Sequence, residues 1–346
     1  MLDFTQLLMK TGLPEMPAAI LLFIVGLLLL IKCGDWFVDG ASGIAHKFHV
    51  PELLIGATVV SIGTTLPEVM VSATSAVSGH GQMAYGNAIG SIICNTALIA
   101  AITIAVRPSK VERKSFIVPV CFFFAAAAFY SVICYTTGKF TRTSGVILLL
   151  IFAIYMIVLV RQAFSEMKRK PEAEEGTEET EKVGDPEPVP SIGKCLVLLV
   201  LGAAGIAVGA DLLVDNGTII ATGLGVPESV VALTFIALGT SLPELVTAIT
   251  SLAKGHGALS LGNIVGANLF NLVLVCGISI TLNPFSVPAN NMIAGINSSL
   301  LVDIPLMLFV MAFMTVPALI REKLSRVQGI VLLMLYAAFT VFQFVM

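Results

Sequence analysis

Two glutamates lie in segments that are apolar and long enough to cross a membrane, and each follows a proline in the same short motif. Glu68 ends the motif GTTLPE, and Glu244 ends the motif GTSLPE. A charged side chain at the centre of a bilayer costs at least about 2.5–3.5 kcal/mol, so a carboxylate found there is retained for a function. We therefore take Glu68 and Glu244 as the centre of a functional site.

The proline of each motif removes a helical hydrogen bond just before the glutamate. Pro67 and Pro243 lack an N–H, and the proline ring clashes with the carbonyl four residues back. We expect the carbonyls over 61–64 and 237–240 to lose helical partners. Bare carbonyls at membrane depth are tolerated only where something else satisfies them, and a bound cation would do so.

Hydroxyl groups lie next to each glutamate in the sequence. Thr64 and Thr240 precede their glutamate by four residues and therefore share its helical face. Thr65 and Ser241, three residues before it, add a second hydroxyl. An anionic site built only from oxygen suits a hard cation, and the absence of Cys and His at these positions makes Zn²⁺ or Cu⁺ a poor fit.

The helix that follows each glutamate carries two glycines and two asparagines at matching positions, in GNAIGSIICN and GNIVGANLFN. Asn95 and Asn271 follow their glutamate by 27 residues, so an antiparallel hairpin can bring their amide oxygens to the same depth. Asn87 and Asn263 begin nearer the helix end and are interpreted as caps or gates. The glycines, spaced by four, allow close approach of helices.

The composition places these motifs in a membrane protein. Hydrophobic residues make up 57% of the 346, charged residues only 12%, and the mean hydropathy is +0.97. A soluble domain carries about 25% charged residues. The net charge of −3 and the lack of a basic stripe exclude a nucleic-acid partner. The six cysteines show no CxxC or His-paired spacing, so they are interpreted as apolar fillers, and no cofactor is expected.

Ten apolar stretches are each about 20 residues long, which is enough to cross a bilayer. They lie around 18–38, 52–78, 85–106, 115–135, 144–163, 192–216, 228–253, 259–282, 292–317 and 327–346. The predicted fold class is an all-α membrane protein with ten transmembrane helices.

The two halves of the chain resemble each other at an offset of 176 residues. Between 51–97 and 227–273, 17 of 47 positions are identical without a gap. Five spans separate the copies, and because that number is odd the copies must be inverted. Inverted repeats are typical of secondary transporters. The predicted domains are a five-helix repeat at 1–165, a linker at 166–191 and a second inverted five-helix repeat at 192–346.

The linker and the loop charges predict the orientation in the membrane. Eight of the 22 acidic residues lie between Glu172 and Glu187, a composition that does not fold alone and indicates a solvated linker. Fifteen Lys and Arg residues fall in loops on the side of this linker, and three fall on the other side. The positive-inside rule therefore predicts a cytoplasmic linker, with both termini outside a multi-pass protein of the plasma membrane.

Other polar residues of note are Asp35, Asp39, Asp211, Asp215, His80 and His256. The aspartate pairs are interpreted as residues at helix ends, with gating as the alternative. The histidines, both in GHG turns, are interpreted as parts of a hydrophilic turn, with proton sensing as the alternative.

With its GTTLPE and GTSLPE motifs and the GNxxG that follows each, the chain resembles the cation/Ca²⁺ exchanger superfamily, and within it the prokaryotic Na⁺/Ca²⁺ exchanger family. The resemblance covers all ten spans. It implies two inverted five-helix halves, four central cation sites, and first and sixth helices that slide against the rest. The partners it implies are Ca²⁺, Na⁺ and the lipid bilayer, without an obligate protein partner.

By position, the resemblance also implies a ligand set: the carboxylates of Glu68 and Glu244, the hydroxyls of Thr64, Thr240, Thr65 and Ser241, the backbones of Ser61 and Ala237, and Ser91 and Asn95. The second half departs from the pattern at two places. Ala267 stands where close relatives have a serine, which removes a hydroxyl from a Na⁺ site. Asn271 stands where several have an aspartate, which argues against K⁺ dependence and leaves an amide as the candidate ligand.

The function implied is electrogenic, K⁺-independent exchange of Na⁺ for Ca²⁺, and the alternative is H⁺/Ca²⁺ antiport. Removal from water favours the neutral form of a carboxylate, so the two glutamates can also carry protons. Relatives coupled to H⁺ usually have acidic or His residues where this chain has Asn95 and Asn271. A passive channel, the alternative from another class, needs a continuous pore, against which the repeat argues. An intramembrane enzyme needs a nucleophile and base or a His-rich metal site, and neither lies at membrane depth.

Overall fold

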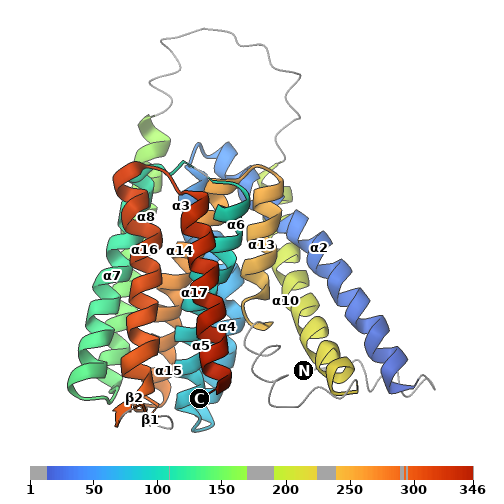
Figure 1. Ribbon diagram of the computed structural model, residues 1–346. Coiled ribbons are helices and arrows are strands. Elements are labelled where there is room, and N and C mark those ends of the chain that lie inside the picture. Colours follow the sequence, from blue (N-terminus) through green and yellow to red (C-terminus); the bar gives the residue numbers. More distant parts are fainter. Residues whose placement is uncertain are drawn as a thin grey trace.

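The computed structural model describes residues 14–108, 110–169, 191–223, 239–288, 292–293 and 295–345, and within them the chain is almost entirely helical (Figure 1). Ala237 and residues 170–190 of the predicted linker lie outside the described residues.

Nine helical segments within the described residues are long and apolar enough to cross a membrane, and α13 (Leu242–Ala253) is a shorter apolar helix. The nine are α2 (Glu15–Lys47); α3 (Glu52–Ile55) with η1 (Gly56–Val60) and α4 (Ser61–Val77); α5 (Gly81–Cys94) with η2 (Asn95–Ala100) and α6 (Ala101–Val106); α7 (Arg113–Thr136); α8 (Arg142–Arg169); α10 (Ile192–Gly223); α14 (Gly257–Phe270) with η4 (Asn271–Val275) and α15 (Cys276–Leu282); η5 (Ser299–Asp303) with α16 (Ile304–Arg321); and α17 (Arg326–Val345).

The ninth predicted span, 292–317, begins later than expected. Its first residues form a two-stranded antiparallel hairpin, β1 (Met292–Ile293) and β2 (Ile296–Asn297), with Gly295 at φ +81° in the turn. The Asn297 side-chain oxygen then accepts the Ser299 N–H at 2.8 Å. The side chain thus satisfies a free N–H at the start of the helix, so the span runs from 299 to 321.

Four of the membrane segments contain a π-helical turn, which the sequence did not predict. These turns are η1, η2, η4 and η5. Two of them begin at Asn95 and Asn271, which occupy matching positions in the two halves. Single π-helical turns inside α-helices occur frequently at functional sites. The helix geometry therefore marks the same two asparagines that the motif spacing selected.

Helix α14 lies at the centre of the bundle and packs against α3, η1, α4 and α13. Its span, Gly257–Leu282, is the most buried of the nine: 83% of the residues in its apolar 18-residue stretch are buried. A Cβ atom on Gly262 would overlap the Leu53 carbonyl oxygen, and one on Gly266 would lie 2.7 Å from the Ala57 Cα. The predicted packing role of these two glycines is confirmed. Residues matching Leu53 and Ala57 in the other half lie outside the described residues, so the role of Gly86 and Gly90 stays a prediction.

Helices α2 and α10 form a pair that packs mainly on itself. A Cβ on Gly26 would lie 2.9 Å from the Gly209 carbonyl oxygen, and one on Gly202 would lie 2.6 Å from the Phe37 nitrogen. Small residues at these crossings let the two backbones touch. In Figure 1 the pair, blue and yellow, slants away from the other helices toward the lower end of the view.

The turns that follow the two glutamate-bearing helices have the same conformation. Gly79 and Gly255 have φ angles of +84° and +88°, which glycine adopts without strain. In each turn the next residue, His80 or His256, donates its N–H to a carbonyl five residues back. Both histidines lie in the predicted turns.

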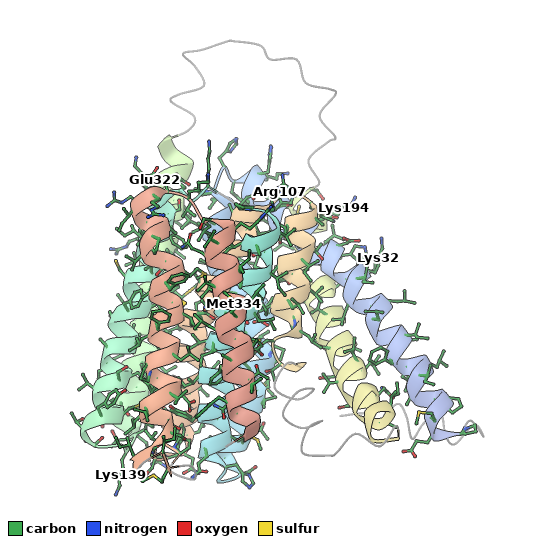
Figure 2. All side chains as sticks on the ribbon, viewed as in Figure 1. Lys32, Arg107, Lys139, Lys194, Glu322 and Met334 are labelled. Atoms are coloured by element: carbon green, nitrogen blue, oxygen red, sulfur yellow. The ribbon has the colours of Figure 1, made fainter. Side chains whose placement is uncertain are left out.

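These matching turns lie at opposite ends of the bundle. Near the first, the Asn283 side chain donates to the last turn of α4 at 2.7 Å. Near the second, the Arg107 guanidinium donates to the last turn of α13 at 3.4 Å. Figure 2 shows Arg107 and Lys194 at one end and Lys139 at the other. The opposition supports the predicted inversion, while the division of the chain at the linker stays a prediction.

The crossing of α14 with α3 and η1 generates a prediction about stability. We expect Gly262→Ala to destabilise the protein by about 1–3 kcal/mol, because the added methyl group meets backbone that cannot move aside. The measurement is the apparent melting temperature in detergent. Gly193→Ala, at an exposed helical glycine with open space around it, is the matched control. Equal melting temperatures for the two variants would contradict the backbone contact.

Candidate cation site

The two glutamates of the paired motifs are fully buried near one another. Glu68 lies in α4 and Glu244 in the first turn of α13, and both are 0% exposed. They are close enough for their charges to interact. Among the described residues, neither forms an ion pair, and all four carboxylate oxygens lack a hydrogen-bond partner. Two like charges buried together in this way need an external positive charge.

Hydroxyls from one half lie beside the carboxylate of the other. Thr64 and Thr65, both in α4, lie next to the Glu244 carboxylate of α13. Thr65 is 0% exposed, and its oxygen has no hydrogen-bond partner among the described residues. The structure therefore brings the two motifs together, as their symmetry predicted.

Two asparagines are further buried residues whose polar atoms lack a partner. Asn95 and Asn271 are both 0% exposed, and the amide oxygen and nitrogen of each lack a partner among the described residues. Leaving a buried polar group unpaired costs about 1–3 kcal/mol, so such a cluster is unfavourable unless a ligand satisfies it. Carboxylate, amide and hydroxyl oxygens are the donor set that Ca²⁺ and other hard cations use.

The serines predicted as ligands differ in the hydrogen bonds that their hydroxyls form. The Ser61 hydroxyl donates to the Gly56 carbonyl at 2.8 Å or the Asn263 carbonyl at 3.0 Å, so its proton is engaged. The Ser241 and Ser91 hydroxyls lie 3.5 Å apart. Ser91, in α5, therefore lies beside the motif of the second half. Ala237 lies outside the described residues.

The backbone before the proline differs between the two halves. In the second half, Thr240 and Ser241 form a turn, and α13 begins at Leu242. In the first half, α4 runs from Ser61 to Val77 with Pro67 inside it. A helix can continue past proline when only the bond to the carbonyl four residues back is lost. The irregular turn there lies earlier, at η1.

Asn87 and Asn263 are not helix caps, which corrects one of the two roles considered for them. Each lies in the second turn or later of a helix, α5 or α14. The Asn87 side-chain oxygen accepts the Thr240 hydroxyl at 3.2 Å, and the Asn263 side-chain oxygen accepts the Thr64 hydroxyl at 3.1 Å. The sequence signal was present in the matching GN pairs, but the partner of each asparagine lies in the other half.

A small cavity of about 10 Å³ separates the α2–α10 pair from the site. Phe37 and Ile206 line it from the pair, and Thr64, Pro67 and Pro243 line it from the two motifs. The Phe37 side chain is 1% exposed and lies against Gly63. Sequence reasoning missed Phe37, because an apolar residue in an apolar helix carries no signal.

Comparison with known proteins decides the family. The family described as sodium/calcium exchanger protein matches residues 18–161 and 194–345. The chain belongs to this exchanger family. Its resemblance to that family, stated from the motifs, is confirmed.

The exchanger has relatives of similar length. It is 33% identical over 319 residues to an uncharacterized membrane protein of Methanocaldococcus jannaschii, covering 91% of this chain and 94% of the relative. It is 30% identical over 355 residues to the sodium/calcium exchanger MaX1 of Methanosarcina acetivorans, covering 94% of this chain and 98% of that relative.

A solved structure shares the fold of this exchanger. The sodium-calcium exchanger NCX_Mj, soaked with 2.5 mM Na⁺ and 1 mM Sr²⁺, superimposes with a TM-score of 0.73 at 31% identity, covering 92% of this chain and 96% of NCX_Mj. The predicted all-α, multi-pass membrane fold is thereby confirmed.

The aspartates of α2 in this exchanger do not lie at a helix end, because α2 continues to Lys47. The Lys254 ammonium, in the turn between α13 and α14, lies 2.7 Å from an Asp39 carboxylate oxygen and 3.5 Å from one of Asp35. Asp211 likewise lies inside α10. The α13–α14 turn is therefore tied to α2 by charge.

The same turn carries a second charged contact. His256 Nδ1 lies 2.6 Å from a carboxylate oxygen of Glu52, at the start of α3, with the two side chains about one third exposed. The hydrogen bond to Glu52 raises the pKa of His256, and partial burial opposes this. The raised value means that the folded protein binds the imidazole proton more tightly than the unfolded chain does.

This contact predicts a dependence of stability on pH. The pair stabilises the fold fully below the ordinary His pKa of about 6.5, and the contribution is lost as the pH rises through the raised pKa. We expect a coupling energy of about 0.5–1 kcal/mol between His256→Gln and Glu52→Gln at pH 5.5, falling toward zero at pH 9. Melting temperatures of the single and double variants measure it. A coupling that grows with pH would contradict the assignment.

Proposed function

We propose that the protein is a secondary antiporter that exchanges Na⁺ for Ca²⁺ across the plasma membrane by alternating access. The observation that carries this proposal is the buried pair Glu68 and Glu244, whose carboxylate oxygens have no partner among the described residues. Membership of the sodium/calcium exchanger family supports the identity of the two ions. The ions are the substrates, and the protein's role is to bind and release them on alternate sides.

The proposed ligands are those that the motifs and the resemblance selected. They are the side chains of Glu68, Glu244, Thr64, Thr240, Thr65, Ser241, Ser91, Asn95 and Asn271 and the backbone carbonyls of Ser61 and Ala237. The contacts of Glu244 with Glu68, Thr64 and Thr65, and of Ser241 with Ser91, support part of the set. The two glutamates would bridge neighbouring ion positions.

The charge of the site determines how exchange responds to voltage. Two carboxylates neutralise one Ca²⁺, whereas three Na⁺ leave the same site with one positive charge. Exchange of three Na⁺ for one Ca²⁺ therefore moves net charge, and each charge moved through 100 mV is worth about 2.3 kcal/mol. Asn271 supplies an amide rather than a third carboxylate, which supports exchange that does not require K⁺.

Alternating access requires a part of the molecule that moves past the site. The α2–α10 pair is suited to this, because its helices touch backbone to backbone and meet the motifs across the Phe37 cavity. We infer that the pair slides as one body against the rest. The end of the bundle that carries Arg107 and Lys194 would face the cytoplasm, with both termini outside (Figure 2).

The proposal predicts which carboxylates transport requires. Glu68→Gln and Glu244→Gln are each expected to lower Na⁺-driven ⁴⁵Ca²⁺ uptake into proteoliposomes more than about 100-fold, because the variants lose a charge from a buried ion site. Glu15→Gln, at an exposed glutamate at the start of α2, is the matched control and should transport like the wild type.

The same assay separates Na⁺ from H⁺ coupling. Uptake driven by an outward Na⁺ gradient, enhanced by a valinomycin potential, is the expected result. Uptake driven by an outward proton gradient alone would overturn Na⁺ coupling in favour of H⁺/Ca²⁺ antiport. Currents without a counter-transported ion would indicate a channel.

Ala267 generates a prediction that separates the two ions. It is 0% exposed in α14 and stands at the position that matches Ser91. We expect Ala267→Ser to change the Na⁺ concentration for half-maximal exchange by about two- to tenfold and that for Ca²⁺ by less than about twofold. Ser91→Ala, at the matching position, is the control for loss of a hydroxyl. Equal effects on both ions would contradict the Na⁺ site.

A further inference from the structure

Two hydrogen bonds link the glutamate-bearing motif of each half to the following helix of the other. Thr240 donates to the side-chain oxygen of Asn87 on α5, at 3.2 Å, and Thr64 donates to that of Asn263 on α14, at 3.1 Å. The two threonines match each other in the repeat, and so do the two asparagines. The contact is thus made twice, in both cases across the interface between the halves.

The surroundings of Asn87 fix which way its amide points. Its nitrogen lies 3.4 Å from the backbone carbonyl oxygen of Glu68 and 2.8 Å from the Ser72 hydroxyl. A carbonyl oxygen only accepts hydrogen bonds, so the amide nitrogen must face it. The amide oxygen then faces Thr240, and because this oxygen also only accepts, the Thr240 hydroxyl must donate.

The direction of that hydroxyl decides what it can offer to an ion. A threonine hydroxyl has one proton and two lone pairs. Once its proton points at the asparagine, the lone pairs are what remain for a third partner. A cation binds to lone pairs and is repelled by an O–H that points toward it. The bond to Asn87 therefore leaves Thr240 only able to accept, which is the state a cation ligand needs.

We propose that Asn87 and Asn263 are positioning residues that orient the hydroxyls of Thr240 and Thr64 toward the transported cations. This inference rests on the proposed function, because it assumes that the two threonines are ligands. Each half then contributes the orienting amide for the other half's ligand.

The two positioning contacts are not equally constrained. Asn87 has both Ser72 and the Glu68 carbonyl as acceptors, whereas the Asn263 amide nitrogen has no partner among the described residues. Ala248, which is 0% exposed in α13, occupies the position that matches Ser72 in the repeat. The Thr240 hydroxyl is consequently oriented by an amide with two anchors, and the Thr64 hydroxyl by an amide whose nitrogen has none among the described residues.

A double-mutant cycle on transport tests the proposal. Asn87→Leu and Thr240→Val, alone and together, are assayed for ⁴⁵Ca²⁺ uptake in proteoliposomes driven by a Na⁺ gradient. Each single variant is expected to raise the half-saturating Ca²⁺ concentration about two- to tenfold, while the maximal rate changes less. The double variant is expected to be no worse than Thr240→Val, because the amide acts only through that hydroxyl. Likewise, the double variant of Asn263→Leu and Thr64→Val is expected to be no worse than Thr64→Val alone.

The control cycle pairs Asn87→Leu with Thr64→Val, which share no hydrogen bond among the described contacts, and here the effects should multiply. Multiplication in the contacting pairs as well would overturn the positioning role. A lower maximal rate at unchanged half-saturating Ca²⁺ would also overturn it and indicate a structural role. If Thr240→Val and Thr64→Val leave the half-saturating Ca²⁺ unchanged, the ligand assignment of the proposed function is wrong instead.

A second pair of variants tests the anchoring of the amides and does not depend on folding of the leucine variants. Ser72→Ala removes one anchor of Asn87 and is expected to weaken Ca²⁺ binding in the wild type, with no effect in Thr240→Val. Ala248→Ser supplies the matching anchor for Asn263 and is expected to strengthen Ca²⁺ binding only while Thr64 is present. An equal effect of Ser72→Ala with and without Thr240 would overturn the inference.

Discussion

The structure is organised around two like charges that the protein does not neutralise. Glu68 and Glu244 are buried beside each other in an apolar bundle, and among the described residues neither has a cationic partner. Under the proposed function, the attraction that offsets their removal from water comes from the transported ions. A conformation that seals the site from both sides is therefore accessible only when the site is loaded. This condition couples the movement of the helices to ion binding, and an antiporter needs that coupling to avoid a leak.

The packing of glycines makes such a site possible in an apolar bundle. Gly262 and Gly266 bring the backbone of α14 against α3 and η1, so that Asn263 reaches both Ser61 and Thr64 in α4. A larger residue at either glycine would separate these helices. The close crossings of α14 therefore hold one part of the site together, while those between α2 and α10 form a second body that touches the site where Phe37 lies against Gly63, beside a small cavity.

The sequence predicted the parts of this arrangement that depend on local pattern. The repeated proline–glutamate motifs, the apolar stretches and the 27-residue spacing to Asn95 and Asn271 indicated the membrane spans and the residues that would share one depth. The partners of Asn87, Asn263 and Lys254 were beyond its reach, because each contact joins residues more than 150 positions apart. The late start of the ninth span was missed because the mostly apolar residues Met292–Ile293 and Ile296–Asn297 form a short hairpin, which an apolar pattern alone does not distinguish from helix.

An inverted repeat would give the two access states equal energy if its halves were identical, so the differences between them set the balance. Lys254 matches Ser78 in the other half, and its ion pair with Asp39 therefore holds α2 at one end of the bundle only. The ion pair is partly exposed and is worth about 1 kcal/mol or less, but that is enough to shift a two-state equilibrium about fivefold. Ser72 and Ala248 differ in the same way within the site. We infer that small differences between the halves, rather than the shared motifs, bias the equilibrium between the two access states of the proposed mechanism.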